Sequence, residues 1–127
     1  LRQGMVSIYL AQALKKGHVQ VKGCLNRYRD FIYIDDVVSV WLSNLDTKLN
    51  NQVLNVGTGV RTTVLDLLQH IKKIMPEVTW AEIAGTPGDQ FGIYADTKKL
   101  KESTGRSDFT PLSTGLSRFV EWSKGRL

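Results

Sequence analysis

Segments with a helical pattern alternate with segments with a strand pattern along the whole 127-residue sequence. The clearest helical pattern covers residues 63–75, where apolar residues recur on one face and Pro76 follows. Thr63 and Asp66 have the spacing of a capping box at its start. Alternation of this kind predicts an α/β fold. A chain of this length is expected to form one compact domain that buries roughly two thirds of its surface.

The same reading assigns the other elements. Helices are predicted over residues 4–15, 35–45, 63–75, 96–105 and 111–125, strands over 18–23, 29–34, 52–57 and 78–83, and a Gly/Pro loop over 85–92. Gly17 is expected to end the first helix, and Asp35 and Asp96 to act as N-caps of two later ones.

The charge balance and the cysteine content exclude some classes of function. Lys and Arg number 17 against 12 Asp and Glu, a net charge of +5. The basic residues are dispersed, which argues against nucleic acid. A solvated surface and a basic lining for a phosphorylated small molecule fit equally well. Cys24 is the only cysteine, which excludes a disulfide framework and a Cys-based zinc site and favours the cytoplasm. No apolar run reaches membrane-spanning length, so no membrane partner is expected.

The stretch "RYRDFIYIDD", residues 27–36, concentrates charge and aromatic rings. In a strand, Asp30 faces away from Arg29, and Asp35 and Asp36 fall at the start of the next helix, so a carboxylate cluster for metal or acid–base work is not expected. Arg29 shares a face with two aromatic residues, which suits holding a phosphate and flanking a ring. A structural pair of Arg29 with an aspartate is an equally good interpretation.

Two further motifs are tempting but incomplete. "NVGTGVRTTVLDL" resembles a dinucleotide loop, yet the third glycine is replaced by Thr62, which predicts no NAD binding there. Tyr94 and Lys98 have the Tyr-x-x-x-Lys spacing of a catalytic pair, but the predicted cap at Asp96 places Tyr94 before the helix, which breaks that geometry. His70 is interpreted as a residue of the helix surface.

Four stretches in order resemble one family. "RDFIYIDDVV", "LNVGTGVRTTVLDLL", "TPGDQFGIYADTKKLKESTG" and "PLSTGLSRFVEW" are similar to the C-terminal part of NAD-dependent epimerase/dehydratases. These are extended short-chain dehydrogenase/reductases that act on nucleotide sugars, with UDP-galactose 4-epimerase as a type member. The resemblance covers nearly the whole chain. It implies that residues 1–127 are a single substrate-binding lobe, a fragment without the N-terminal Rossmann NAD-binding lobe, in keeping with a start at Leu1.

The resemblance also implies where the chemistry lies. The family's Gly-rich NAD loop, its catalytic Ser/Thr and its Tyr/Lys pair fall outside this sequence. The chain alone is therefore expected to hold no cofactor and to be catalytically inactive. In the intact family enzyme, NAD takes a hydride from the sugar and returns it.

Several positions match the family's substrate site. Arg29 matches the arginine of Arg-Asp-Phe/Tyr, which grips the nucleotide diphosphate, and Phe31 is the aromatic residue of that triplet. Gln20 and Lys22 match the strand whose backbone addresses the base, although the position of Lys22 is often aromatic in the family. Val60, after the Gly-x-Gly turn, resembles a residue near the nucleotide.

Two more positions lie in the Gly/Pro loop. Thr86 stands where the family often has a second phosphate-binding arginine, which implies weaker diphosphate binding or a different donor sugar. Asp89 keeps the acid of this loop and is expected to hold a ribose hydroxyl.

The expected function is the nucleotide-sugar-binding portion of an NAD-dependent nucleotide-sugar epimerase or dehydratase. The alternative is a stand-alone, non-catalytic module that binds a nucleotide or a protein. The helix at 35–45 has apolar residues around more than one stripe, which calls for cover on two sides. We therefore expect self-association, most simply as a dimer, or cover by a missing NAD-binding lobe. Closure of the patch by the last helix, through Phe119 and Trp122, is the alternative.

Overall fold

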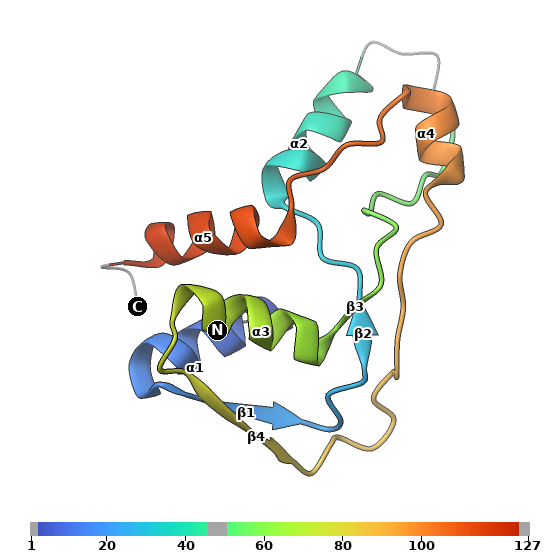
Figure 1. Ribbon diagram of the computed structural model, residues 1–127. Helices are drawn as coiled ribbons and strands as arrows, with labels where there is room; N and C mark the ends of the chain where they lie inside the picture. The colour runs from blue at the N-terminus through green and yellow to red at the C-terminus, as the bar shows by residue number, and fades with distance from the viewer. Residues whose placement is uncertain (1–2, 46–50, 125–127) are drawn as a thin grey trace.

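The computed structural model describes residues 3–45 and 51–124 and has the mixed α/β architecture that the sequence predicts. In chain order the elements are α1 (Met5–Lys16), β1 (His18–Lys22), β2 (Tyr28–Arg29), α2 (Ile34–Ser43), β3 (Thr62–Thr63), α3 (Val64–Ile74), β4 (Thr79–Ile83), α4 (Lys98–Thr104) and α5 (Leu112–Ser123) (Figure 1). Among these described elements, no helix is both long enough and apolar enough to cross a membrane.

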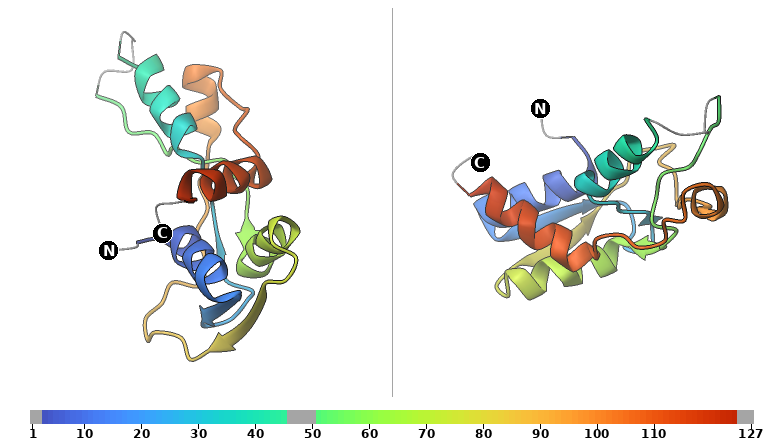
Figure 2. Two further views of the ribbon diagram at one scale, coloured as in Figure 1. Left: turned by 90° about the vertical axis from the view of Figure 1, so that its left-hand side faces the viewer. Right: turned by 90° about the horizontal axis from the view of Figure 1, so that it is seen from above.

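The strands form two small sheets. β1 and β4 pair in parallel, with Val19 beside Trp80, and β2 pairs antiparallel with β3. The connection from β1 to β4 runs through β2, α2, β3 and α3. β1 and β4 lie at one end of the molecule, and α2 and α4 lie at the other end, as two views show (Figures 1 and 2).

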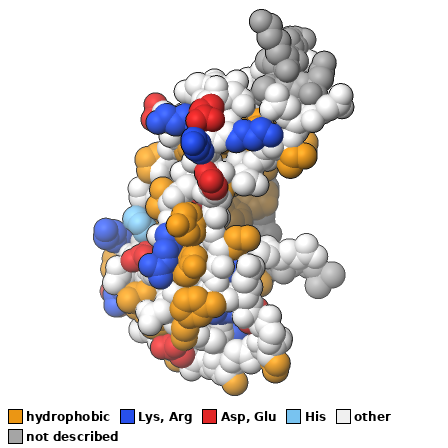
Figure 3. Space-filling model, turned by 90° about the vertical axis from the view of Figure 1, so that its right-hand side faces the viewer, with side chains coloured by type: hydrophobic (Ala, Val, Ile, Leu, Met, Phe, Trp, Pro, Cys, Tyr) orange, Lys and Arg blue, Asp and Glu red, His pale blue; other side chains and the backbone are white. Residues whose placement is uncertain are grey.

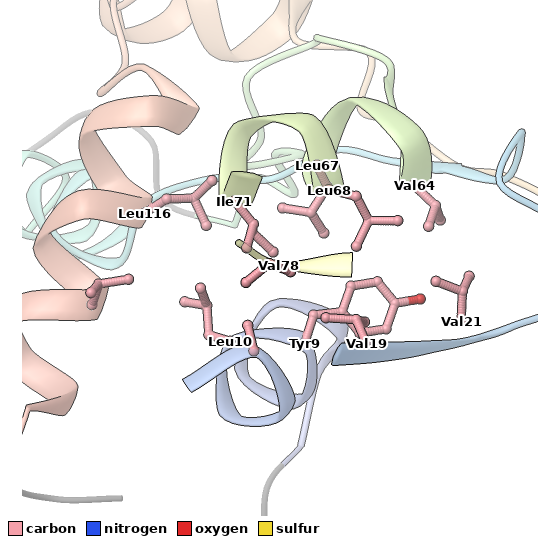
Figure 4. Packing of buried hydrophobic residues seen from close by; sticks show 12 residues of the cluster. Tyr9, Leu10, Val19, Val21, Val64, Leu67, Leu68, Ile71, Val78 and Leu116 are labelled. Atoms are coloured by element: carbon pink, nitrogen blue, oxygen red, sulfur yellow. The ribbon is translucent and has the colours of Figure 1, made fainter. Parts of the chain in front are cut away.

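The main core is a cluster in which three helices pack against β1 and β4 (Figure 4). The fully buried side chains Leu67, Leu68 and Ile71 of α3 face Tyr9 and Leu10 of α1 across the interior. Burying one such aliphatic side chain stabilises the fold by roughly 1.5–3 kcal/mol.

The predicted capping box at the start of α3 is confirmed. Thr63 Oγ1 accepts a hydrogen bond from the Asp66 amide at 3.0 Å, and Asp66 Oδ2 accepts one from the Thr63 amide at 2.9 Å. These bonds from Thr63 lower the pKa of the Asp66 carboxyl, so this exposed group stays ionised and keeps its cap to lower pH than an ordinary aspartate.

A second set of contacts joins α2 to the segment after α4. The buried Asp36 carboxylate accepts hydrogen bonds from Arg106 Nη2 at 3.1 Å and from the Thr110 amide at 2.8 Å. Arg106 Nη1 also donates to Ser39 Oγ at 2.6 Å. The first turn of α2 is thereby fixed by residues about 70 positions away in the sequence.

Most of the predicted elements are confirmed, but two strand predictions are wrong. Of the predicted strand 29–34, only Arg29 pairs with another strand, as the second residue of β2, and the helix already begins at Ile34. The predicted strand 52–57 has no ladder partner among the described residues, and Val53 is 85% exposed. A strand needs a partner for its backbone groups. In this segment, the Val53 carbonyl instead accepts a bond from Lys99 Nζ.

The predicted helix caps are partly corrected. Tyr33, not Asp35, is the N-cap of α2, and Asp35 lies in its first turn. Thr97 is the N-cap of α4, although Asp96 Oδ1 still accepts the Lys98 amide at 3.0 Å. The predicted end of α1 at Gly17 is confirmed, since Gly17 has the left-handed conformation that closes a helix.

Candidate functional site

The C-terminal end of the loop at 85–92 is fastened to β2. The Tyr28 amide donates to the Phe91 carbonyl at 3.2 Å, and the Ile93 amide donates to the Tyr28 carbonyl at 3.4 Å. Arg29 Nη2 donates to the Gln90 carbonyl at 2.9 Å. The predicted Arg29–Asp pair is therefore not what the structure shows, because the Arg29 guanidinium bonds to backbone carbonyls.

One residue before Tyr28, a buried arginine holds the acid of the same loop. Arg27 Nη1 lies 2.5 Å from Asp89 Oδ2, and Arg27 Nη2 donates to the Lys22 carbonyl at the end of β1. The Arg27 side chain is 9% exposed and that of Asp89 is 42% exposed. The loop is thus attached both to β2 and, through Arg27, to the end of β1.

The charges of Arg27 and Asp89 affect the pKa of the nearby Tyr9. Burial raises the pKa of the Tyr9 hydroxyl, the Arg27 guanidinium opposes that rise and the Asp89 carboxylate adds to it. The raised pKa keeps the Tyr9 phenol neutral, as the polar end of a core side chain.

Asp30 organises the turn at residues 57–59. Its Oδ1 accepts from the Thr58 amide at 3.0 Å and from Thr58 Oγ1, and its Oδ2 accepts from the amides of Gly59 at 2.9 Å and Ala95 at 3.2 Å. One carboxylate thus joins three distant segments of the chain. Because Asp30 makes these bonds, the segment after Arg29 leaves the ladder and the predicted strand stops.

The same contacts decide whether the Gly57–Gly59 turn fits NAD. A dinucleotide loop presents free backbone amides to a pyrophosphate. Here the amides of Thr58 and Gly59 are already bonded to Asp30, and a Cβ on Gly57 would lie 2.7 Å from Asp30 Oδ2. The turn is closed by an internal carboxylate, and its residues do not fit a bound dinucleotide.

The predicted base-binding residues lie on the solvent side of β1. Gln20 and Lys22 are exposed, and they alternate with the buried Val19 and Val21. The Gln20 amide donates to Gln12 Oε1 at 2.7 Å, so this backbone group already has a partner.

The remaining predicted residues surround the fastened loop. Thr86 is exposed, and its carbonyl accepts from the Asp89 amide at 3.1 Å. Val60 is 58% exposed beside the turn that Asp30 organises. Phe31 lies beyond the end of β2 and is partly buried against the core. The prediction that Arg29 and Phe31 lie on one face of a strand is therefore wrong. Three predicted residues are linked by these contacts. Arg27 bonds to Asp89 and to the Lys22 carbonyl, and the loop that carries Asp89 is bonded to Arg29. Gln20 lies on the exposed side of β1, where its amide is bonded to Gln12, and its role in binding a base stays a prediction.

A groove of about 720 Å³ is lined in part by Phe31. Aromatic side chains from the segment before α2 and from α5 line it, and Arg118 lies over the Tyr33 ring at 5.4 Å. Its volume is within the range of ligand sites in proteins.

The Tyr94 and Lys98 spacing does not form a catalytic pair. Tyr94 precedes α4, as predicted, and the centre of its ring lies 6.2 Å from the centre of the Tyr28 ring. His70 is half-buried on α3. In the described parts of the chain, no three His, Cys, Asp or Glu side chains are grouped so as to hold a metal ion.

Apolar side chains gather on the face that carries the connection from β4 to α4 (Figure 3). Phe91, Ile93 and Tyr94 of this connection are each more than half exposed. The guanidinium of Arg61 lies 4.3 Å from the centre of the Tyr28 ring, which itself contacts Phe91 edge-on.

The sequence reasoning missed Arg27 and the role of Asp30. Arg27 lies just before β2, outside the strand, so no strand pattern points to it. The partner of Arg27 is 62 residues away, and nothing in the local sequence identifies it.

Comparison with known proteins gives a family match to the first part of the chain and relatives that align with almost all of it. Residues 2–57 match the family described as "NAD dependent epimerase/dehydratase family". A protein of Methanocaldococcus jannaschii named "Putative UDP-glucose 4-epimerase" is 33% identical over 124 residues, which are 95% of this chain and 39% of that protein. The comparisons support the NAD dependent epimerase/dehydratase family for this chain.

Solved structures agree with this family. The UDP-glucose 4-epimerase of Thermotoga maritima with UDP-glucose has a TM-score of 0.87 at 31% identity, over 97% of this chain and 40% of that one. The UDP-glucuronic acid 4-epimerase of Bacillus cereus with UDP-glucuronic acid and NAD has a TM-score of 0.86 at 26% identity, over 96% and 40%. The chain thus spans about two fifths of the length of its epimerase/dehydratase relatives.

Proposed function

We propose that this chain is the C-terminal, nucleotide-sugar-binding portion of an NAD-dependent nucleotide-sugar epimerase or dehydratase. One observation carries the proposal. The loop with Thr86 and Asp89 is bonded to Arg29 through the Gln90 and Phe91 carbonyls and to Arg27 through Asp89, which supports a site with a cation for a diphosphate and an acceptor for hydroxyls. The solved relatives with UDP-glucose and UDP-glucuronic acid support a ligand of this class.

The same proposal assigns the redox chemistry to residues outside this chain. The Gly57–Gly59 turn is closed by Asp30, and Tyr94 precedes its helix, so neither motif offers an NAD site or a catalytic base. NAD supplies hydride transfer in the intact enzyme, while the residues described here bind and orient the nucleotide. The chain alone is catalytically inactive in this account, and its compartment is the cytoplasm.

A non-catalytic binding module is the second candidate. It is favoured by the exposed apolar side of α2, where Trp41 is 70% and Leu42 is 61% exposed. In the first proposal this side is covered by the remainder of a longer enzyme. In the second it is covered by another protein or by a second copy of the chain.

Replacing Arg29 by alanine tests the nucleotide proposal. We expect Arg29→Ala to weaken the binding of UDP-glucose by about 1.5–3 kcal/mol, the range for hydrogen bonds to a charged group. Titration calorimetry measures this, with urea unfolding to show that the variant remains folded. The control is Lys101→Ala, which removes one positive charge from the exposed surface of α4. Equal affinity of a folded Arg29→Ala and the wild type would reduce Arg29 to a residue that only holds the loop.

A further inference from the structure

Arg27 is placed to control the geometry of Asp89. Its side chain is buried, and its two Nη groups reach in different directions, one to the Asp89 carboxylate and one to the Lys22 carbonyl. A fork of this kind fixes direction as well as charge, which a lysine cannot reproduce. The arginine therefore connects the loop acid to the end of a core strand.

The surroundings leave Arg27 little freedom. Gly23 lies against the guanidinium, and a Cβ at that position would come within 3.2 Å of Arg27 Cζ and Nε. Gly23 also has φ of 77°, a conformation that favours glycine. Arg27 Nε is buried and has no hydrogen-bond partner among the described residues, so the position of the guanidinium is set by its two Nη bonds.

The two oxygens of the Asp89 carboxylate have different surroundings. Oδ2 is held by Arg27, while the side chain as a whole is 42% exposed. For Oδ1, the described residues provide no hydrogen bond, so this oxygen can accept hydrogen bonds from a ligand. A carboxylate accepts readily from two neighbouring hydroxyl groups.

We propose that Arg27 is a positioning residue, which orients Asp89 so that its free oxygen accepts hydrogen bonds from the ribose hydroxyls of a bound nucleotide. This inference rests on the proposed function. Arg27 itself does not touch the nucleotide. It acts through Asp89 and through the loop that carries it.

The first test compares ribose recognition. UDP and 2′,3′-dideoxy-UDP are titrated into the wild type, Arg27→Met, Arg27→Lys and Asp89→Ala. The wild type is expected to prefer UDP by about tenfold to a hundredfold, as for hydrogen bonds to a charged acceptor. The preference should fall below about threefold in Arg27→Met and Asp89→Ala, and Arg27→Lys should recover part of it. Adding Arg27→Met to Asp89→Ala should change the preference no further, because the two residues act as one unit.

The second test needs no nucleotide. Hydrogen exchange at the Asp89 amide, which donates to Thr86, should become at least tenfold faster in Arg27→Met. Exchange at the Met75 amide at the end of α3 should stay unchanged and shows that the variant is folded.

The outcomes separate the two ideas. If the wild type binds neither nucleotide, the proposed function fails, and the exchange experiment still decides whether Arg27 holds the loop. A wild-type preference for UDP that persists in folded Arg27→Met would overturn the role of Arg27. So would unchanged exchange at the Asp89 amide in that variant.

Discussion

Asp30→Ala is expected to destabilise the chain by about 3 kcal/mol, since each hydrogen bond to a charged acceptor contributes about 1.5–3 kcal/mol and the bonds are not additive. The variant leaves the amides of Thr58, Gly59 and Ala95 without their acceptor. Because Asp30 is only half-buried, water can reach some of these amides and reduces the total. Urea unfolding followed by tryptophan fluorescence measures the change.

Two further variants identify the cause. Asp30→Asn keeps the shape but turns an NH₂ donor toward backbone amides, so it should cost nearly as much as alanine. Asp108→Ala removes an exposed carboxylate and should stay within about 0.5 kcal/mol of the wild type. If Asp30→Asn were as stable as the wild type, the acceptor role of the carboxylate would be wrong.

The exposed side of α2 is expected to cause self-association. Four of its residues recur at helical spacing and form one stripe, which Leu45 continues just after the helix: Ile34, Val38, Trp41, Leu42 and Leu45, exposed by 62%, 46%, 70%, 61% and 76%. A continuous apolar stripe of this size is unusual on a monomeric protein. Light scattering over a series of concentrations should show the mass rise from 14.3 kDa toward twice that value.

The exposure of two tryptophans argues against the alternative that α5 covers this stripe. Trp122 of α5 is itself 57% exposed, and Trp41 is not shielded. Leu42→Glu puts a charge on the stripe and should restore a monomer. Val53→Glu changes an exposed apolar residue outside α2 and should not restore it. A wild type that remains monodisperse and monomeric at high concentration would contradict the expectation.

Local patterns were sufficient where an element is specified by its own residues. α3 could be predicted because Thr63 and Asp66 cap it and because Leu67, Leu68 and Ile71 line one buried face. β1 could be predicted because exposed residues alternate with buried valines. In these elements the periodicity of the sequence and the surrounding core agree.

Elements that depend on distant partners could not be predicted. The segment after Arg29 looks like a strand, but Asp30 binds the turn at Thr58 and Gly59 and ends the ladder. The segment at 52–57 has strand-forming residues and no strand beside it among the described residues. For the site, the sequence named Arg29 and Asp89, while the arginine that contacts Asp89 was identified only by the fold.

The central claim is that this chain binds a nucleotide sugar and leaves NAD to residues outside it. Its most direct test is a pair of calorimetric titrations of the wild-type chain, one with UDP-glucose and one with NAD. The account predicts weak, saturable heat with UDP-glucose that is suppressed by excess UDP, and no binding of NAD. Micromolar binding of NAD, or no binding of UDP-glucose at millimolar concentration, would contradict it.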